Sequence, residues 1–415
     1  MLAGLLDYVN LSGALFSTGR YAESLTACDI GLQFTPGFVA LHVNRGKALV
    51  VLERFTEAID AAKTALRLDA ECIDAYTTLG FAYEGMGEYE RGLACVRDAI
   101  AVDSRSPEAH GALATLLLRQ GDLRAGLPEQ EFHWIDESAY LVSRFGSQRC
   151  WDGGDPSGLR LLLVHNQGLG DLIQMARYFP LLRERCEGVI VECAPTLGAL
   201  IGRIPGVDAV FERGDPGMEG RYDAYARVMG LPRMFGTELA TIPNTVPYLA
   251  TDPRRRDIWR KRIGSGDGLR VGIGWGGNPL HNRDHDRSIP LDTFAPLAQL
   301  PGIRWFSLQH GRRGAEAAPA GLDLVRLGAD FATMDDTAAA IAELDLVIGV
   351  DSALSHLAGA LGKPIWMLVP RRPDWRWLRR GDRSAWYPTM RIFRQTALGD
   401  WTGAVAAVRD ALASR

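Results

Sequence analysis

The stretch LDLVIGVDSALSHLAGALGKPIWMLVP (344–370) joins two apolar runs through one helical run. Residues 344–352 predict a buried strand, residues 352–362 a helix that stops at Gly362, and residues 364–370 a second strand. A strand, a helix and a strand in this order are typical of parallel strands joined by a crossover helix. The sequence around this stretch therefore predicts an α/β region with a parallel sheet.

The same alternation extends towards the N-terminus. Further strands are predicted at 159–166, 188–195, 269–277 and 305–309, and a helix at 171–185. The strands that begin at 159 and 269 both end in glycines, and a basic, then glycine-rich stretch separates the two series. This pattern predicts two Rossmann-like lobes with a ligand cleft between them, at the carboxyl ends of their strands.

The first third of the chain has a different pattern with a period of 34 residues. The middle unit carries Tyr76, Leu79, Gly80 and Tyr83; the units 34 residues before and after it carry His42, Arg45, Gly46 and Leu49, and His110, Leu113, Ala114 and Leu117. The period resembles the tetratricopeptide repeat, a helix–turn–helix unit that must stack to bury its apolar face. We therefore expect three parts: a helical repeat domain at 1–138 and two Rossmann-like lobes at 139–255 and 256–415.

Charge is distributed unevenly along the 415 residues. The formal net charge is −4, which argues against a dedicated nucleic-acid-binding protein. Residues 1–140 hold 11 Lys and Arg against 20 Asp and Glu, a net charge of −9. This acidity fits either solvated outer helix faces or a concave groove that captures a peptide or protein partner.

Several sequence features bear on the cellular location. No run of about 18 apolar residues is present, and the six cysteines form no C-x-x-C pattern. The first residues, MLAGLLDYVN, lack the basic segment of a signal peptide. We expect a cytoplasmic protein that does not insert stably into a membrane; its oligomeric state is not predicted.

Four polar segments are candidates for binding or catalysis. The first, Gln167-Gly168-Leu169-Gly170-Asp171, joins a predicted strand to a predicted helix. Its glycines allow a substrate to approach the backbone. Asp171 fits either the N-cap of that helix or a general base that takes a proton from an acceptor hydroxyl.

The second segment follows the strand that begins at 269. Gly276 and Gly277, between Trp275 and Asn278, suit contact with a diphosphate, and Arg287 downstream is either a phosphate partner or a surface arginine. Asp284-His-Asp286 has the D-x-D spacing of some metal sites, but we expect no metal because so short a pattern arises often by chance.

The third segment, Asp351-Ser352-Ala353-Leu354-Ser-His356, lies where a strand turns into a helix. Ser352 and the backbone N–H groups of Ala353 and Leu354 form a candidate anion site. His356 lies one helical turn after Ser352, so it either points at the same ligand or is a core histidine.

The fourth segment, 366–395, holds eight arginines and two aspartates among four tryptophans and a tyrosine. Such a segment fits a packed loop with solvated arginines, a single-stranded nucleic-acid surface or a nucleotide-diphosphate site. We favour the last, because the segment adjoins the candidate anion site.

Eight motifs follow one another along the chain: QGLGDLIQMARYFPLL, WGGN, RSIP, FSLQ, the 344–370 stretch, PDWRWL, WYP and GDW. Together with the repeats, they resemble bacterial tetratricopeptide-repeat proteins whose C-terminal half is similar to glycosyltransferase family nine, the heptosyltransferase-like group. The resemblance covers 134–412. It implies the two-lobed GT-B fold and an inverting, metal-independent transfer from a nucleotide-diphosphate sugar, without a cofactor.

The resemblance also implies roles for particular residues. Asp171 matches the catalytic base, with Gln167, Gly168 and Gly170 beside it on the acceptor side, and His356 is expected to share in catalysis. The expected donor-binding residues are Trp275, Gly276, Gly277, Asn278, Arg287, Gln309, Asp351, Ser352, Ala353 and Leu354.

The acceptor stays open at this point. Repeats joined to such a transferase are similar to the architecture of protein O-GlcNAc transferases, which favours a protein or peptide acceptor docked in the repeat groove. The alternatives are a transferase for lipopolysaccharide or a lipid-linked glycan, and a scaffold that keeps the fold without activity.

Overall fold

The computed structural model describes residues 2–134, 141, 144–146, 149–165 and 167–415. The chain divides into two compact units, Met1–Arg144 and Phe145–Arg415. The border expected between residues 138 and 139 lies outside the described residues, as does residue 166 of the strand predicted at 159–166.

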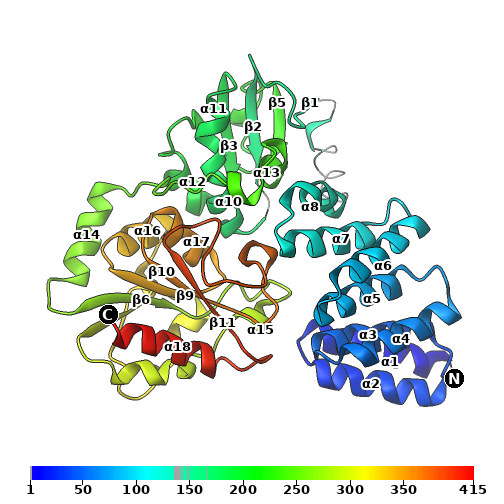
Figure 1. The fold of residues 1–415 in the computed structure, drawn as a ribbon. Helices are drawn as coiled ribbons and strands as arrows, with labels where there is room; N and C mark the ends of the chain where they lie inside the picture. Colours follow the sequence, from blue (N-terminus) through cyan, green and yellow to red (C-terminus); the bar gives the residue numbers. More distant parts are fainter. Residues whose placement is uncertain (1, 135–140, 142–143, 147–148, 166) are drawn as a thin grey trace. The chain divides into compact units, whose positions relative to one another are not determined.

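The first unit is an array of helical hairpins (Figure 1). Its helices are α1 (Leu2–Ser17), α2 (Tyr21–Phe34), α3 (Val39–Val51), α4 (Phe55–Leu68), α5 (Ile73–Met86), α6 (Tyr89–Val102), α7 (Pro107–Gln120) and α8 (Leu123–Gln130). The helices α3, α5 and α7 begin 34 residues apart, which matches the sequence period. Small residues bring the helices of a hairpin together: a Cβ on Gly80 of α5 would lie 2.4 Å from Val96 Cγ2 of α6.

The first helix of each hairpin belongs to a continuous layer. The pairs α1–α3, α3–α5 and α5–α7 pack on one another, whereas contacts between successive second helices are sparse. Polar bridges cross this layer: Lys47 of α3 pairs with Asp74 of α5 at 2.8 Å, and Arg119 of α7 pairs with Glu84 of α5 at 3.3 Å. We call the layer of α1, α3, α5 and α7 the first-helix face.

Most acidic residues of this unit lie away from the first-helix face. In the helices, acids on the second helices outnumber those on the first, and the remainder follow the connections. Of the two expectations for the acidic charge, the structure therefore favours solvated outer surfaces over an acidic groove.

The second unit contains two parallel sheets. The smaller has the order β1-β5-β2-β3-β4, with every neighbouring pair parallel. Its strands are β1 (Arg149–Cys150), β2 (Arg160–Val164), β3 (Gly188–Cys193), β4 (Ala209–Glu212) and β5 (Ala224–Arg227). The chain leaves β2 towards β3 on one side and returns to β5 on the other, so the sheet has a switch point at β2.

The larger sheet has the order β11-β10-β9-β6-β7-β8, again with all pairs parallel. Its strands are β6 (Leu269–Gly274), β7 (Ile303–Ser307), β8 (Leu324–Arg326), β9 (Leu346–Val350), β10 (Ile365–Val369) and β11 (Met390–Arg394). This is the 3-2-1-4-5-6 order of a doubly wound sheet, whose switch point lies between β6 and β9. The chain thus has the predicted order of a helical repeat array followed by two α/β lobes.

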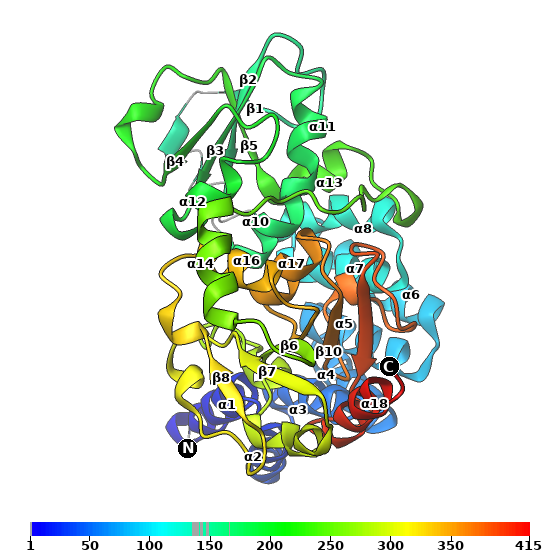
Figure 2. The same ribbon diagram turned by 90° about the vertical axis from the view of Figure 1, so that its left-hand side faces the viewer.

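The helices of this unit are α10 (Leu169–Met175), α11 (Phe179–Arg183), α12 (Pro195–Ile201), α13 (Leu231–Met234), α14 (Pro253–Ile263), α15 (Asp284–Arg287), α16 (Met334–Ala342), α17 (Ala353–Ala360) and α18 (Thr402–Ala413). The helix predicted at 171–185 is broken into α10, a 3₁₀ turn and α11, where Pro180 supplies no N–H. The connection between the two sheets, expected at 251–268, contains α14, which runs beside α16 (Figure 2). The expected border at 255/256 falls inside α14.

The last helix, α18, packs on β10, β11 and the 3₁₀ segment Leu291–Gln299. Its apolar face of Trp401, Val405, Val408 and Leu412 is buried in the core of the larger sheet. The main partners of α18 therefore all belong to the C-terminal lobe.

Two further expectations concern thiols and membranes. None of the six cysteines, all of which the structure describes, forms a disulfide; Cys28, Cys186 and Cys193 are buried, whereas Cys150 is exposed. Within the part of the chain that the structure describes, no helix has both the length and the apolar character needed to cross a bilayer. The cytoplasmic location stays a prediction.

Candidate active site

A cavity of about 1020 Å³ lies where the two sheets present the carboxyl ends of their central strands. The loops after β2, β6 and β9 all line it. Because these strands flank the switch point of each sheet, the chain diverges there and leaves a crevice, which is where doubly wound folds bind ligands.

The cavity gathers nearly all of the predicted residues. The following line it: Gln167, Gly168, Gly170, Asp171, Gly276, Gly277, Asn278, Arg287, Gln309, Asp351, Ser352, Ala353, Leu354 and His356. Trp275 does not: its side chain is fully buried in the core of the larger sheet, and its indole N–H donates to Glu316 at 3.1 Å. Our expectation that Trp275 binds the donor is therefore corrected.

The two sides of the cavity meet where α10 packs against α17. Gly170 makes this approach possible, since a Cβ at that position would lie 2.8 Å from His356 Cδ2 and 3.3 Å from Ala353 Cα. The glycine of the first loop thus serves helix packing between the lobes, in addition to any role towards a substrate.

Asp171 occupies the third position of α10, and Gly168 is the N-cap. The N-cap alternative for Asp171 is thus wrong by position. Its Oδ2 nevertheless accepts the Gly168 N–H at 3.0 Å, as an acidic residue does in a capping box. Its Oδ1 accepts from Arg376 Nη2 at 2.8 Å. Arg376 comes from the C-terminal lobe, so Asp171 lies at the junction of the two lobes.

The anion site predicted at the start of α17 has the expected local geometry. Ser352 is the N-cap, and its side chain makes no capping hydrogen bond. The first N–H groups of a helix have no partner within the helix, and they carry the positive end of its dipole. Because Ser352, Ala353 and Leu354 line the cavity, this end of α17 faces the space where a ligand would lie.

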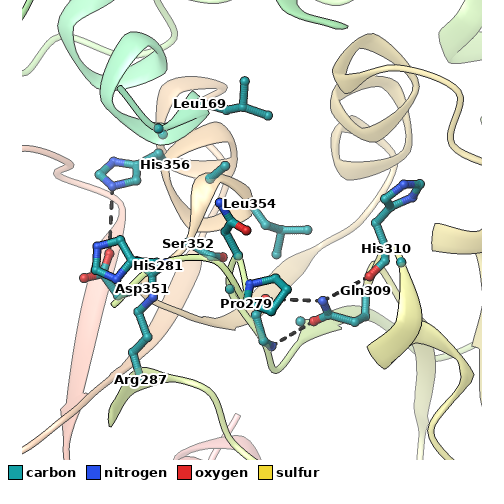
Figure 3. Close-up of a pocket in the computed structure, with 18 of the residues that line it drawn as sticks. Leu169, Pro279, His281, Arg287, Gln309, His310, Asp351, Ser352, Leu354 and His356 are labelled. Atoms are coloured by element: carbon teal, nitrogen blue, oxygen red, sulfur yellow. Dashed lines mark hydrogen bonds and ion pairs between the residues drawn. The ribbon is translucent and has the colours of Figure 1, made fainter. Parts of the chain in front are cut away.

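His356 is both a buried histidine and a cavity residue. Its Nδ1 is hydrogen-bonded to the Tyr387 hydroxyl at 2.8 Å, and its Nε2 lies 3.9 Å from Asp351 Oδ1 (Figure 3). Burial, followed by the nearby arginines Arg376 and Arg177, lowers the pKa of His356 to about 3. The imidazole is therefore neutral at physiological pH, and its approach to Asp351 is not an ion pair.

Burial has the opposite effect on the neighbouring carboxyl group. It raises the pKa of Asp351 to about 6, with the Asp374 charge as the next cause. Perturbed groups of this kind, collected in one cleft, are typical of functional sites.

The glycine-rich loop after β6 is shaped around arginines. A Cβ on Gly276 would lie 2.3 Å from Arg313 Cδ, and one on Gly277 would lie 2.9 Å from Arg287 Nε. Arg287 Nε is buried without a hydrogen-bond partner among the described residues. The two glycines thus make room for two cations that line the cavity.

Gln309 holds this loop in place. Its Oε1 accepts the backbone N–H groups of Trp275 at 2.9 Å and Gly276 at 2.8 Å, while its Nε2 donates to Gly276 O at 3.2 Å. Figure 3 shows the carboxamide turned towards the loop backbone. Gln309 lines the cavity, and its carboxamide makes these hydrogen bonds with the loop; a contact with the donor stays a prediction.

Both aspartates of the D-x-D pattern, Asp284 and Asp286, lie beside arginine side chains. Asp284 accepts from the Ser288 hydroxyl at 2.8 Å and lies 3.6 Å from both Arg287 and Arg313. Asp286 pairs with Arg283 at 3.1 Å. Among the described residues, no group of three or more His, Cys, Asp and Glu side chains is arranged to hold a metal ion.

The arginine-rich segment mostly serves the fold. Arg394 donates to backbone carbonyls, including Trp377 O at 2.7 Å, and Arg391 lies over the Phe393 ring. Of the eight arginines at 366–395, all within the described chain, Arg376 is the one that lines the cavity. The prediction that this segment forms a diphosphate-binding patch is therefore too broad.

Several cavity residues were not named individually among the predicted site residues. They are His281, His310, Arg312, Arg313, Glu316, Asp374 and Arg376, together with some apolar and glycine positions. Asp374 and Arg376 belong to the quoted PDWRWL motif, so the sequence contained a signal for them. Arg312 and Arg313 come shortly after the FSLQ strand, and this position at a strand end was the signal for them.

Comparison with known proteins fits this division of the chain. A family model of glycosyltransferase family 9 (heptosyltransferase) matches residues 308–368, and a tetratricopeptide-repeat model matches residues 77–129. Both resemblances drawn from the sequence are thereby confirmed, in the predicted order. The family 9 match includes Gln309 and the Asp351–His356 segment, but not the Asp171 loop.

Among curated proteins, the chain is similar to Protein FlbA of Caulobacter vibrioides, with 29% identity over 80% of this chain. The chain spans 60% of the length of FlbA. Among solved structures it is similar to TTC0263, a thermophilic TPR protein of Thermus thermophilus, with 19% identity, 34% of this chain and 83% of that chain covered, and a TM-score of 0.30. MamA from Desulfovibrio magneticus matches with 19% identity, 35% and 78% coverage, and a TM-score of 0.27.

Proposed function

We propose that the second unit is an inverting, metal-independent glycosyltransferase of the GT-B type. It moves a sugar from a nucleotide-diphosphate sugar to an acceptor hydroxyl. The observation that carries this proposal is a single cavity with two unlike sides: an anion site with arginines on the C-terminal lobe, and the Asp171 carboxylate on the N-terminal lobe. The family 9 match at 308–368 supports the reaction class.

The donor diphosphate lies against the start of α17 and Arg287. Both supply positive charge or N–H donors at the place where negative charge develops on the leaving group, which is the largest contribution in many transfers. Arg312 and Arg313 extend the cationic lining. These groups take the part that a divalent cation plays in other transferases.

The transfer is one displacement. The acceptor oxygen attacks the anomeric carbon from the face opposite the diphosphate, and the bond from that carbon to the phosphate oxygen breaks with its electron pair leaving on the nucleoside diphosphate. Asp171 takes the proton of the acceptor hydroxyl. The neutral His356 acts as a hydrogen-bonding group towards the sugar or the diphosphate, since it is not a protonated acid at physiological pH.

The acceptor is a protein or peptide that binds the first-helix face. The tetratricopeptide-repeat match and the continuous layer of first helices support this part of the proposal. A lipid-linked glycan or lipopolysaccharide acceptor, and a scaffold without turnover, are the alternative outcomes of the tests.

A panel of nucleotide-diphosphate sugars in a thermal-shift assay on the full chain tests donor binding. One of them at about 100 times its dissociation constant stabilises the second unit by roughly 2.7 kcal/mol. We expect Arg287→Gln to weaken that ligand by about tenfold or more, since it removes a charged hydrogen-bond donor. Arg254→Gln, an exposed arginine on α14, is the control. Failure of every nucleotide sugar to stabilise the wild type contradicts the proposal.

A further inference from the structure

Arg376 makes a fork of three side-chain hydrogen bonds, two of which connect the two lobes. From the 3₁₀ turn Trp375–Trp377, its Nη2 donates to Asp171 Oδ1 at 2.8 Å and its Nε to Gln174 Oε1 at 2.6 Å, both on α10. Its Nη1 donates to Asp374 Oδ1 at 2.9 Å. The side chain is 10% exposed, so the fork is a built feature and not a surface contact.

The fork lies in a cluster of carboxylates. Burial lowers the pKa of Arg376, but Asp374 and Asp171 outweigh burial and raise it, and Asp351 adds to their effect. The guanidinium is therefore charged, and all three carboxylates act on it. Arg376, Asp171, Asp374 and Asp351 all line the cavity.

Asp171 is held at two points that differ in kind. The Gly168 N–H that binds Oδ2 belongs to the same helix start, so this contact is fixed by the backbone. The Arg376 contact to Oδ1 comes from a long side chain of the other lobe. The second contact is thus the one that a ligand is able to replace without unfolding α10.

We propose that Arg376 is a donor-controlled latch on Asp171. The guanidinium neutralises the carboxylate and joins it to the C-terminal lobe; when a nucleotide-diphosphate sugar binds, its phosphate oxygens draw the guanidinium away from Oδ1. The carboxylate, still oriented by Gly168, then faces the acceptor. This inference rests on the proposed function and adds its control: the acceptor is activated only after the donor has bound.

Physical reasons favour this exchange. A diphosphate brings two negative charges and several oxygens, and Arg–phosphate pairs are frequently bidentate, whereas Arg376 gives Asp171 a single hydrogen bond. Asp374 continues to hold Nη1, so the arginine pivots without leaving the cavity. The start of α17 and Arg287 line the same cavity and bind the same anion, so the ligand itself replaces the contact between Arg376 and Asp171.

A double-mutant cycle measures the competition. Wild type, Asp171→Asn, Arg376→Gln and the double variant of the full chain are titrated with ADP, GDP and UDP by calorimetry, and with the corresponding nucleosides. If Asp171 competes with the diphosphate for Arg376, D171N tightens nucleoside-diphosphate binding by about threefold or more, and R376Q removes that gain. The affinity for nucleosides changes in none of the variants, because a nucleoside has no phosphate for which Asp171 and Arg376 compete.

Two results overturn the latch. In one, D171N gives the same tightening with and without Arg376, which shows only the removal of a repulsive charge. In the other, D171N leaves diphosphate binding unchanged. Asp410→Asn, an exposed carboxylate on α18, is the matched control for loss of charge. If R376Q fails to fold, the cycle uses Arg376→Lys instead. The tightening caused by D171N must then be smaller in the Arg376→Lys background than in the wild-type background. Absence of any nucleotide binding refutes the proposed function instead, so the two failures are distinguishable.

Discussion

Asp351 and His356 are two titratable groups whose pKa values burial moves in opposite directions, to about 6 and about 3. Neither side chain is exposed enough for water to restore its ordinary value: Asp351 is 14% exposed and His356 6%. At neutral pH the pair is a carboxylate facing a neutral imidazole. The site therefore keeps a negative charge near the start of α17, where we propose that the diphosphate binds, and this charge costs stability.

Asp351→Asn tests that cost. The raised pKa means that Asp351 binds a proton more tightly in the folded state than in the unfolded state. The protonated side chain therefore contributes fully to stability below pH 3.8, and this contribution is lost as the pH rises through about 6. At pH 8 we expect the variant to be more stable than wild type by up to about 3 kcal/mol, and near pH 4 equally stable. Urea unfolding followed by tryptophan fluorescence measures this, because nine of the ten tryptophans lie after residue 145. A difference that grows towards low pH contradicts the assignment.

His356→Gln tests the other group, with the opposite sign. A lowered pKa means that the unfolded state takes up a proton first, so the wild type loses stability as the pH falls from 6.5 towards 3, by about 1.4 kcal/mol per pH unit. The variant lacks this term, and its stability falls less steeply in the same window. Equal slopes for the two proteins refute the neutral imidazole.

At the scale of elements, the contact between α10 and α17 places the two sides of the cavity. Gly170→Ala inserts a methyl group 2.8 Å from His356 and 3.3 Å from the α17 backbone. We expect a loss of about 1–3 kcal/mol in stability and weaker nucleoside-diphosphate binding, because the helices must separate. Gly198→Ala on α12, whose Cβ would meet nothing closer than 3.9 Å, is the control and is expected to be neutral or stabilising. Equal effects of the two variants on binding contradict the packing argument.

Apolar runs were sufficient to predict most strands. Buried strands such as β3 and β9 read as continuous hydrophobic stretches because helices cover both faces of a parallel sheet. β5 was missed, since AYAR (224–227) is short and mixed. β11 was missed because Arg391 and Arg394 interrupt the apolar run of Met390, Ile392 and Phe393, all three of which are buried.

The candidate site was predictable where its residues stand in motifs at strand ends, as in the Asp351–His356 segment. Its lobe-to-lobe contacts were not, since Asp171 and Arg376 are 205 positions apart and no local pattern relates them. The predicted role of Trp275 in donor binding was wrong for a related reason. The WGGN motif marks the loop, but the alternation of side chains along β6 places Trp275 in the core.

At the scale of the whole molecule, our proposal assigns docking of the acceptor to the first unit and the transfer reaction to the second. Lys47→Glu on α3 reverses one charge on the first-helix face, and Lys63→Glu on α4 makes the same change on an exposed second helix. We expect K47E to reduce transfer to a protein acceptor several-fold, because it replaces the ion pair with Asp74 by repulsion between two carboxylates. The affinity for nucleoside diphosphate is expected to stay unchanged. K63E changes neither. Equal transfer by both variants contradicts docking on this face and favours a glycolipid acceptor.

In the proposed reaction, Asp171 is the base for sugar transfer in this cavity. The most direct measurement is the release of nucleoside diphosphate by the full chain, with the stabilising nucleotide sugar and an acceptor extract, for wild type and Asp171→Asn. We expect turnover by the wild type and about a hundredfold or greater loss in D171N, with donor binding retained or tightened. Turnover by D171N at the wild-type rate, or none by a wild type that binds the donor, contradicts the account.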